Sequence, residues 1–211
     1  HWTLFGQIVI LCLIQIGGIG FMTVAIALVM IARRKIGINS RMIMQDSIAA
    51  PQVGGIVRMT KLVLVGTAIV EGTGALLLCF HFCPRFGIGK GIYFSIFHSI
   101  SAFCNAGFDL MGIEEQFSSL TAEAGNWYIN LIIMALIVIG GLGFFVWHDL
   151  IQSRFRFSKM RLHTKIVLVI TILLIVVGTL VIFLLEQEAK VFSGLSIKDQ
   201  ILVSAFQSVS A

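Results

Sequence analysis

Residues 97–112 read FHSISAFCNAGFDLMG, and this stretch decides the fold that we expect for the chain. An apolar run over residues 91–103 ends there, and short residues with a glycine follow it at 104–107. A helix over that run would be roughly 20 Å long, because each residue adds ~1.5 Å, whereas the hydrocarbon core of a bilayer is ~30 Å thick. The stretch therefore predicts a helix that enters a membrane, stops partway and turns back.

The composition indicates a membrane protein with several spans. Of the 211 residues, 58% are hydrophobic and 12% are charged, and the mean hydropathy is +1.00. Ordinary soluble domains carry about 25% charged residues, so one water-soluble core could not bury this much apolar surface. We expect an all-α polytopic membrane protein. The sequence begins at His1 and shows no signal peptide, and we expect it to be an excerpt of a longer chain.

The net charge of +5 could suggest a nucleic-acid partner, but the placement of the charges argues against one. Most of the 15 basic residues lie in two stretches, 33–61 and 154–165, while acidic residues collect elsewhere. Basic loops of membrane proteins face the cytoplasm, and no aromatic residues that could stack on bases are interleaved with these charges. The pattern predicts two cytoplasmic loops and no nucleic-acid partner.

Four apolar runs are long enough to cross a bilayer, and two are too short. The long runs cover residues 8–32, 62–82, 127–147 and 166–185, and the short ones cover 91–103 and 197–211. With both basic loops inside, each short run follows a span that leads outward. Irregular backbone at membrane depth is tolerated only where protein buries it or where it lines a water-filled cavity. Both short runs are therefore candidate re-entrant pore helices.

Two motifs occur twice along the chain. IGGIGF at residues 16–21 recurs as IGGLGF at 139–144, and FHSISA at 97–102 recurs as FQSVSA at 206–211. Internal self-similarity is the sequence signature of a repeated structural unit. The order of the motifs predicts repeated span–pore helix–span (M-P-M) units.

These units divide the chain into five expected segments. We expect an inner span of repeat one at 1–36, a cytoplasmic loop at 37–61, repeat two at 62–150, a second cytoplasmic loop at 151–165, and the outer span and pore helix of repeat three at 166–211.

The turn after the first short run has the chemistry of a cation site. A helix that enters from outside points its C-terminus into the membrane, and the partial negative charge of that end favours a cation. The main-chain oxygens of Cys104, Asn105, Ala106 and Gly107 could then replace the hydration shell of a potassium ion. Asp109 would lie near the outer mouth and concentrate cations there. The alternative is that residues 104–107 form an ordinary turn in an extracellular loop.

Two further sets of residues are candidates for structural or gating roles. Glu71 lies in the middle of the second span, where a carboxyl group is costly and is a functional candidate by default. We favour a brace of the pore helix over an ion ligand. Glycines in the two IGG motifs permit close backbone approach, or they act as hinges during gating. They are Gly17, Gly18, Gly20, Gly140, Gly141 and Gly143.

Three stretches together resemble the Trk/Ktr/HKT superfamily of potassium transporters: FHSISAFCNAGFDLMG at 97–112, LIQIGGIGFMT at 13–23 and AFQSVSA at 205–211. Within it the chain is most similar to KtrB-type membrane subunits. The resemblance implies four M-P-M repeats with pseudo-fourfold symmetry, each giving one strand of a selectivity filter. Gly107 matches the filter glycine of the second repeat.

The resemblance also implies a function and partners. Such subunits take up potassium through a backbone-carbonyl filter, driven by the membrane potential and often dependent on sodium. They are multi-pass proteins of the bacterial cell membrane. The implied partners are membrane lipid, a second copy in a homodimer, and a KtrA-type nucleotide-binding cytoplasmic ring that the two basic loops would contact. No organic cofactor is expected on this chain.

Other classes of protein have less support. A secondary transporter with broken helices would bind its substrate through side chains at the membrane midplane, yet the spans hold only Glu71 and a few neutral polar groups. A membrane anchor or scaffold would not need repeated half-helices. The chain contains no HExxH, no Ser/His/Asp set and no phosphate-binding glycine loop, so we do not expect an enzyme. Its four cysteines form no CxxC pair, so we expect neither a disulfide nor a zinc site.

Overall fold

The computed structural model describes residues 3–20, 56–113, 119–186 and 196–211, and every regular element in these residues is a helix. For this part of the chain the predicted all-helical class is confirmed. The helices are α1 (Leu4–Ile19), α4 (Ile56–Phe86), α5 (Ile88–Phe103), α6 (Trp127–Gly141), α7 (Phe144–Gln152), α8 (Leu162–Leu185) and α9 (Ile197–Ser210), with short 3-10 helices η1 (Met111–Ile113), η2 (Thr121–Glu123) and η3 (Phe157–Lys159).

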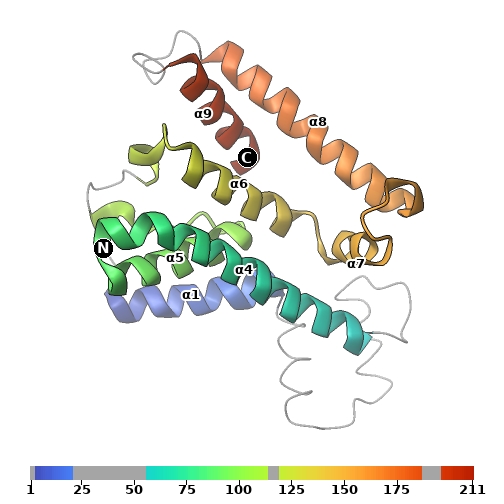
Figure 1. Ribbon diagram of the computed structural model, residues 1–211, viewed down its shortest axis with the longest axis horizontal. Coiled ribbons are helices and arrows are strands. Elements are labelled where there is room, and N and C mark those ends of the chain that lie inside the picture. Colours follow the sequence, from blue (N-terminus) through green and yellow to red (C-terminus); the bar gives the residue numbers. More distant parts are fainter. Residues whose placement is uncertain (1–2, 21–55, 114–118, 187–195) are drawn as a thin grey trace.

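The helices form two groups that meet at α6 (Figure 1). In the first group α4 packs along α5, and α1 contacts both of them. In the second group α9 packs along α8. Because α6 contacts α4 and α5 as well as α9, it lies between two pairs of helices, each made of one long and one short helix.

Two helices are long and apolar enough to cross a bilayer, judged by length and composition: residues Thr60–Phe86 of α4, and α8. They contain the predicted spans 62–82 and 166–185. α1 is a shorter apolar helix, and residues 21–32 of the predicted first span lie outside the described residues. Most of the predicted loop at 37–61 lies outside them as well, and its last residues, from Ile56 onward, are helical.

The third predicted span, 127–147, is divided between two helices that are bent at a break. α6 ends at Gly141, and α7 leaves it at an angle of 93°. Gly143 at the break has φ +83° and ψ +149°, a conformation that is essentially restricted to glycine. Gly20, which occupies the same place in the first copy of the motif, ends α1 with φ +88°. The break escaped prediction because the residues on both sides of it are equally apolar.

The two short apolar runs, 91–103 and 197–211, are helical in α5 and α9. α5 has 16 residues and α9 has 14, which gives lengths of roughly 24 and 21 Å. α5 follows α4 after a sharp reversal at Gly87, whose φ is +82°. At Gly91 the two helices approach so closely that a Cβ would lie 2.5 Å from Cys83 Cα.

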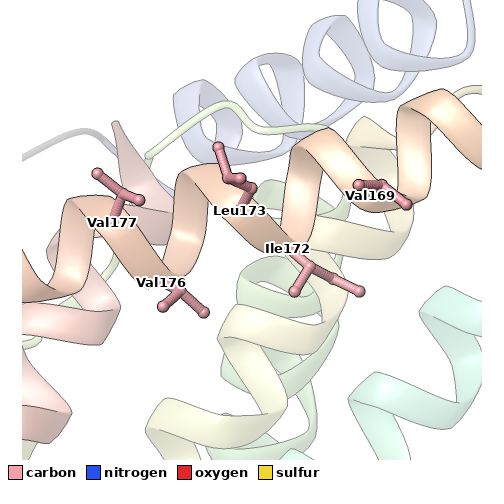
Figure 2. Close-up of a pocket in the computed structure, with 5 residues that line it drawn as sticks. All are labelled: Val169, Ile172, Leu173, Val176 and Val177. Atoms are coloured by element: carbon pink, nitrogen blue, oxygen red, sulfur yellow. The ribbon is translucent and has the colours of Figure 1, made fainter.

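The buried apolar core lies between α4, α5 and α6. Leu78, Phe82, Phe97 and Ile129 are each at most 2% exposed. α8 differs, since Thr164 is its one buried residue. Its apolar side chains point outward and line a shallow pocket (Figure 2), formed by Val169, Ile172, Leu173, Val176 and Val177. An exposed helix of this kind is typical of a membrane protein, and a pocket lined by five aliphatic side chains offers no ligand to a cation.

Candidate functional site

The chain reverses direction at the C-terminal end of α5. Ala106 N–H donates a hydrogen bond to the Ser101 carbonyl at 2.9 Å, which is the six-residue closure of a common helix C-cap. Asn105 and Gly107 have φ values of +52° and +70°. Glycine adopts this region without strain, and asparagine visits it more readily than most residues do. These two residues turn the backbone away from the helix.

The segment after the turn runs back along α5. Ser101 Oγ donates to the Phe108 carbonyl at 2.6 Å, and Leu110 N–H donates to His98 Nε2 at 3.4 Å. Later residues of the segment thus contact earlier residues of the helix, which means that the two run antiparallel. Residues 88–110 therefore form a hairpin with a helical arm, a tip at 104–107 and a return arm without regular secondary structure.

The tip of this hairpin presents main-chain oxygens. Among the described residues, none donates a hydrogen bond to the main-chain oxygen of Cys104, Asn105, Ala106 or Gly107. All four residues are at least partly exposed. Four carbonyls without a donor beyond a helix C-terminus could serve as ligands for a cation. Asp109 follows on the return arm, where its carboxylate accepts a hydrogen bond from a backbone N–H at 2.9 Å.

Glycines from both copies of the IGG motif pack against the end of α5. A Cβ on Gly18 of α1 would overlap the Cys104 side chain, and one on Gly140 of α6 would overlap the Phe103 carbonyl oxygen. The two flanking helices thus approach α5 as closely as only glycine permits.

The remaining motif glycines have different surroundings. A Cβ on Gly141 would lie 3.3 Å from Asn105 Nδ2, which is a tight but tolerable contact, whereas one on Gly17 would meet nothing within 4 Å. Gly20 and Gly143 act through their backbone conformation and not through a close contact. The structure therefore brings Gly18, Gly140 and Gly141 to the predicted site.

Glu71 lies behind the tip of the hairpin and is 8% exposed. Gln15 Nε2 of α1 lies 3.1 and 3.0 Å from its two carboxylate oxygens, and Cys104 Sγ lies 3.9 Å from Oε1. The main-chain oxygen of Glu71 accepts a hydrogen bond from Ser99 Oγ at 2.7 Å. Glu71 thus connects α4 with α1, with α5 and with the first residue of the tip.

The contact between α4 and α5 recurs between α8 and α9. Ser208 Oγ donates to the Ile175 carbonyl at 3.0 Å, as Ser99 Oγ does to that of Glu71. The two serines hold the same place in FHSISA and FQSVSA. In each long helix a glycine three residues further on faces that serine, namely Gly74 in α4 and Gly178 in α8.

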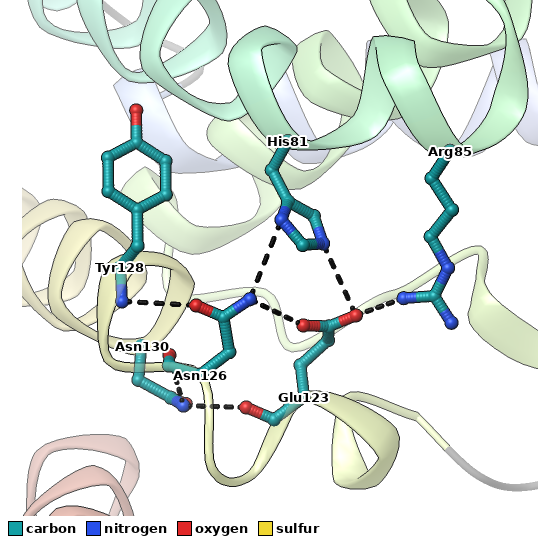
Figure 3. Close-up of polar contacts among 6 residues, drawn as sticks. All are labelled: His81, Arg85, Glu123, Asn126, Tyr128 and Asn130. Atoms are coloured by element: carbon teal, nitrogen blue, oxygen red, sulfur yellow. Dashed lines mark hydrogen bonds and ion pairs between the residues drawn. The ribbon is translucent and has the colours of Figure 1, made fainter.

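A second polar cluster, which the sequence analysis missed, lies at the C-terminal end of α4 (Figure 3). The buried Glu123 carboxylate pairs with Arg85 and lies 3.3 Å from His81 Nε2. Asn126 Nδ2 donates to Glu123 Oε2, and Asn130 Nδ2 to the Glu123 main-chain oxygen, both at 2.8 Å. The cluster ties the segment before α6 to α4. His81 and Arg85 lie 42 and 38 residues from Glu123 along the chain, so no local motif indicates the cluster.

The fold is typical of a helical membrane protein. A comparison with protein families agrees, because residues 3–211 match the TrkH family, described as cation transport protein. The chain belongs to this family. The resemblance to the Trk/Ktr group that we drew from the motifs is thereby confirmed, and so is the expectation of a transport protein and not an enzyme.

Three curated relatives cover the whole chain. It is 40% identical over 211 residues to Ktr system potassium uptake protein B of Bacillus subtilis and 37% identical over 210 residues to potassium/sodium uptake protein NtpJ of Enterococcus hirae. It is 32% identical over 213 residues to Ktr system potassium uptake protein B of Vibrio alginolyticus. Each match covers 100% of this chain but only 45–46% of the relative, so the chain spans about half the length of these proteins.

Proposed function

We propose that the chain is part of the ion-translocating subunit of a Ktr/Trk-type potassium uptake system, and that residues 104–107 supply one strand of its selectivity filter. The observation that carries the proposal is the run of four main-chain oxygens at the tip of the α5 hairpin without a hydrogen-bond donor among the described residues.

The electrostatics of the tip favour a dehydrated cation over an anion or a neutral solute. The C-terminal end of α5 contributes roughly half a negative charge, and carbonyl dipoles replace the water ligands that potassium loses. Within the described residues, no three His, Cys, Asp or Glu side chains come together as a metal site. Main-chain oxygens are thus the better candidates for ion ligands, with Asp109 concentrating cations near the outer mouth.

We further propose that the chain is built from M-P-M units with pseudo-fourfold symmetry, divided at the segment boundaries expected from the sequence. The paired serine–carbonyl contacts at Ser99 and Ser208 support a common origin of α4–α5 and α8–α9. The positive φ of Gly20 and Gly143 supports the equivalence of α1 and α6. In this arrangement each pore helix lies beside an outer span and ends beside an inner span.

The relatives support potassium as the transported ion and allow a role for sodium, since two are named potassium uptake proteins and one a potassium/sodium uptake protein. The words "Ktr system" in two of the names support a multi-component assembly. We therefore propose a multi-pass subunit of a bacterial cell membrane that forms a homodimer. The basic loops at 37–61 and 151–165 would face a KtrA-type cytoplasmic ring.

The test is a Gly107→Ser substitution in the protein expressed from its natural gene, in cells that lack their own potassium uptake. A Cβ at Gly107 meets nothing within 4 Å, but φ is +70°, so the added side chain strains the backbone without a collision. Strain of about 1–3 kcal/mol at an ion ligand corresponds to a loss of about 5- to 150-fold in affinity. We expect weaker potassium uptake and a lower preference for potassium over sodium.

A matched control is Gly89→Ser in the first turn of α5, where a Cβ also meets nothing within 4 Å and φ is not positive. It should leave both the potassium affinity and the ion preference unchanged. If Gly107→Ser behaves like this control, residues 104–107 are not part of a filter and the proposal is wrong.

A further inference from the structure

The packing of the long helix on the short helix does not require a carboxylate. The α8–α9 pair makes the same serine–carbonyl hydrogen bond and the same glycine contact as the α4–α5 pair, yet Ile175 takes the place of Glu71. A carboxyl group inside an apolar span is costly. The side chain of Glu71 must therefore serve something that α8–α9 packing does without.

The contacts of the carboxylate point to the tip of the hairpin. One oxygen, Oε1, lies 3.9 Å from Sγ of Cys104, the first residue of the tip, and both oxygens accept from Gln15 Nε2. Gln15 is one turn from Gly18 on α1, and Gly18 is the residue whose missing Cβ leaves room for the Cys104 side chain. Two neighbouring helices thus fix the Cys104 side chain, α1 by close packing at Gly18 and α4 by one hydrogen bond to Glu71.

We propose that Glu71 is a positioning residue for ion selectivity, which holds the strand 104–107 in place through Cys104 and Gln15 and does not itself bind the ion. This inference rests on the proposed function and deepens it. The strand can discriminate between potassium and sodium only if its carbonyls keep their spacing, and hydrogen bonds behind the strand limit how far they collapse toward a smaller ion.

Two substitutions separate a hydrogen-bonding role from a charge that acts on the ion. Glu71→Gln removes the charge and keeps the carbonyl that accepts from Gln15. Its amide can also donate to Gln15 Oε1, a buried oxygen without a partner among the described residues. Glu71→Ile introduces the side chain that the equivalent position of α8 carries, so the helices should still pack.

The experiment measures the ratio of potassium to sodium uptake affinities for both variants in the protein expressed from its natural gene, with the amount in the membrane checked by immunoblot. We expect Glu71→Ile to lower this ratio about tenfold, because the variant loses the hydrogen bonds of Glu71 to Gln15 and Cys104. We expect Glu71→Gln to stay within about threefold of the native ratio. If Glu71→Gln loses selectivity as fully as Glu71→Ile, the charge matters and the positioning role is wrong.

A second variant keeps the proposal testable if Glu71→Ile does not reach the membrane. Cys104→Ala removes the thiol without adding bulk and should lower the selectivity ratio in the same direction. If Cys104→Ala reaches the membrane in the native amount and keeps the native ratio, the proposed path through Cys104 is wrong.

Gly107→Ser separates a failure of the proposed filter from a failure of the positioning role of Glu71. If it changes selectivity while Glu71→Ile and Cys104→Ala do not, the filter stands and the positioning role of Glu71 is wrong. If Gly107→Ser changes nothing, the filter proposal itself fails, and the role assigned to Glu71 fails with it.

Discussion

The two copies of the IGG motif meet the same helix end in different ways. In α1 the second glycine of the motif, Gly18, contacts α5 at Cys104, and the first, Gly17, contacts nothing within 4 Å. In α6 the first glycine, Gly140, contacts the Phe103 carbonyl oxygen, and the second, Gly141, has more room. Identical residue types at identical spacing thus provide two different contacts, because α1 and α6 approach α5 from different directions.

The third glycine has a similar backbone conformation in both copies of the motif. Gly20 and Gly143 both have φ between +83° and +88°, and each ends its helix or lies at a break. A backbone conformation is a local property, so it recurs with the motif. A contact also depends on the partner helix, so it does not recur with the motif. The following predictions test this distinction, from the largest expected effect to the smallest.

Gly140→Ala should be the most damaging of the glycine substitutions. Its Cβ would overlap a backbone oxygen, which cannot move aside as a side chain can, and overpacking of this kind costs about 3 kcal/mol or more. We expect a clear loss of thermal stability in detergent together with loss of potassium uptake. Gly17→Ala, the same change at the equivalent position of α1, should be neutral or slightly stabilising, because alanine favours a helix. Equal effects of the two changes would contradict the asymmetry.

Gly18→Ala should have an intermediate effect. The overlap involves the Cys104 side chain together with a closer approach to its Cα, at 3.2 Å, so the Cys104 side chain and the tip of the hairpin must move. We expect a cost of about 2 kcal/mol in the free energy of unfolding and a lower preference for potassium over sodium. Gly141→Ala should cost less than half as much, since its nearest neighbour is an amide 3.3 Å away. Thermal unfolding and ion uptake measure both variants, and a larger effect of Gly141→Ala than of Gly18→Ala would contradict this prediction.

Ser99→Ala and Ser208→Ala should have the smallest effects. Each removes one hydroxyl that donates to a carbonyl of the neighbouring long helix, at 2.7 and 3.0 Å. A hydrogen bond of this kind contributes about 1 kcal/mol. We expect similar losses of stability, with the larger one at Ser99 because it is fully buried. A loss at one serine alone would argue against equivalent roles of α4–α5 and α8–α9.

Much of the fold could be predicted from composition and local pattern. The apolar runs at 62–82 and 166–185 indicate α4 and α8 because length and hydropathy alone decide whether a helix can cross a bilayer. The turn at 104–107 was predictable because small residues and a glycine follow an apolar run. The break at Gly143 was not, since neither hydropathy nor helix propensity changes enough across one glycine to separate a bend from a close contact.

Parts of the site could be predicted only as candidates. Glu71 was a candidate because a carboxyl group in an apolar span is unusual. Its partners could not be predicted, because Gln15 and Cys104 lie 56 and 33 residues away along the chain. Glu123 was not a candidate, because its partners His81 and Arg85 are 42 and 38 residues away and belong to a different helix. Polar pairs of this kind carry no local signal.

By itself the sequence determined which segments are helical, which of them are too short to span and where the chain turns back. These properties depend on hydropathy, length and local conformation. Only the tertiary structure decided which glycine of each motif touches α5, how α7 departs from α6, and which atoms surround the Glu71 carboxylate. Those features depend on how each helix is rotated about its own axis, and a helix that is apolar on every side carries no pattern that specifies this rotation.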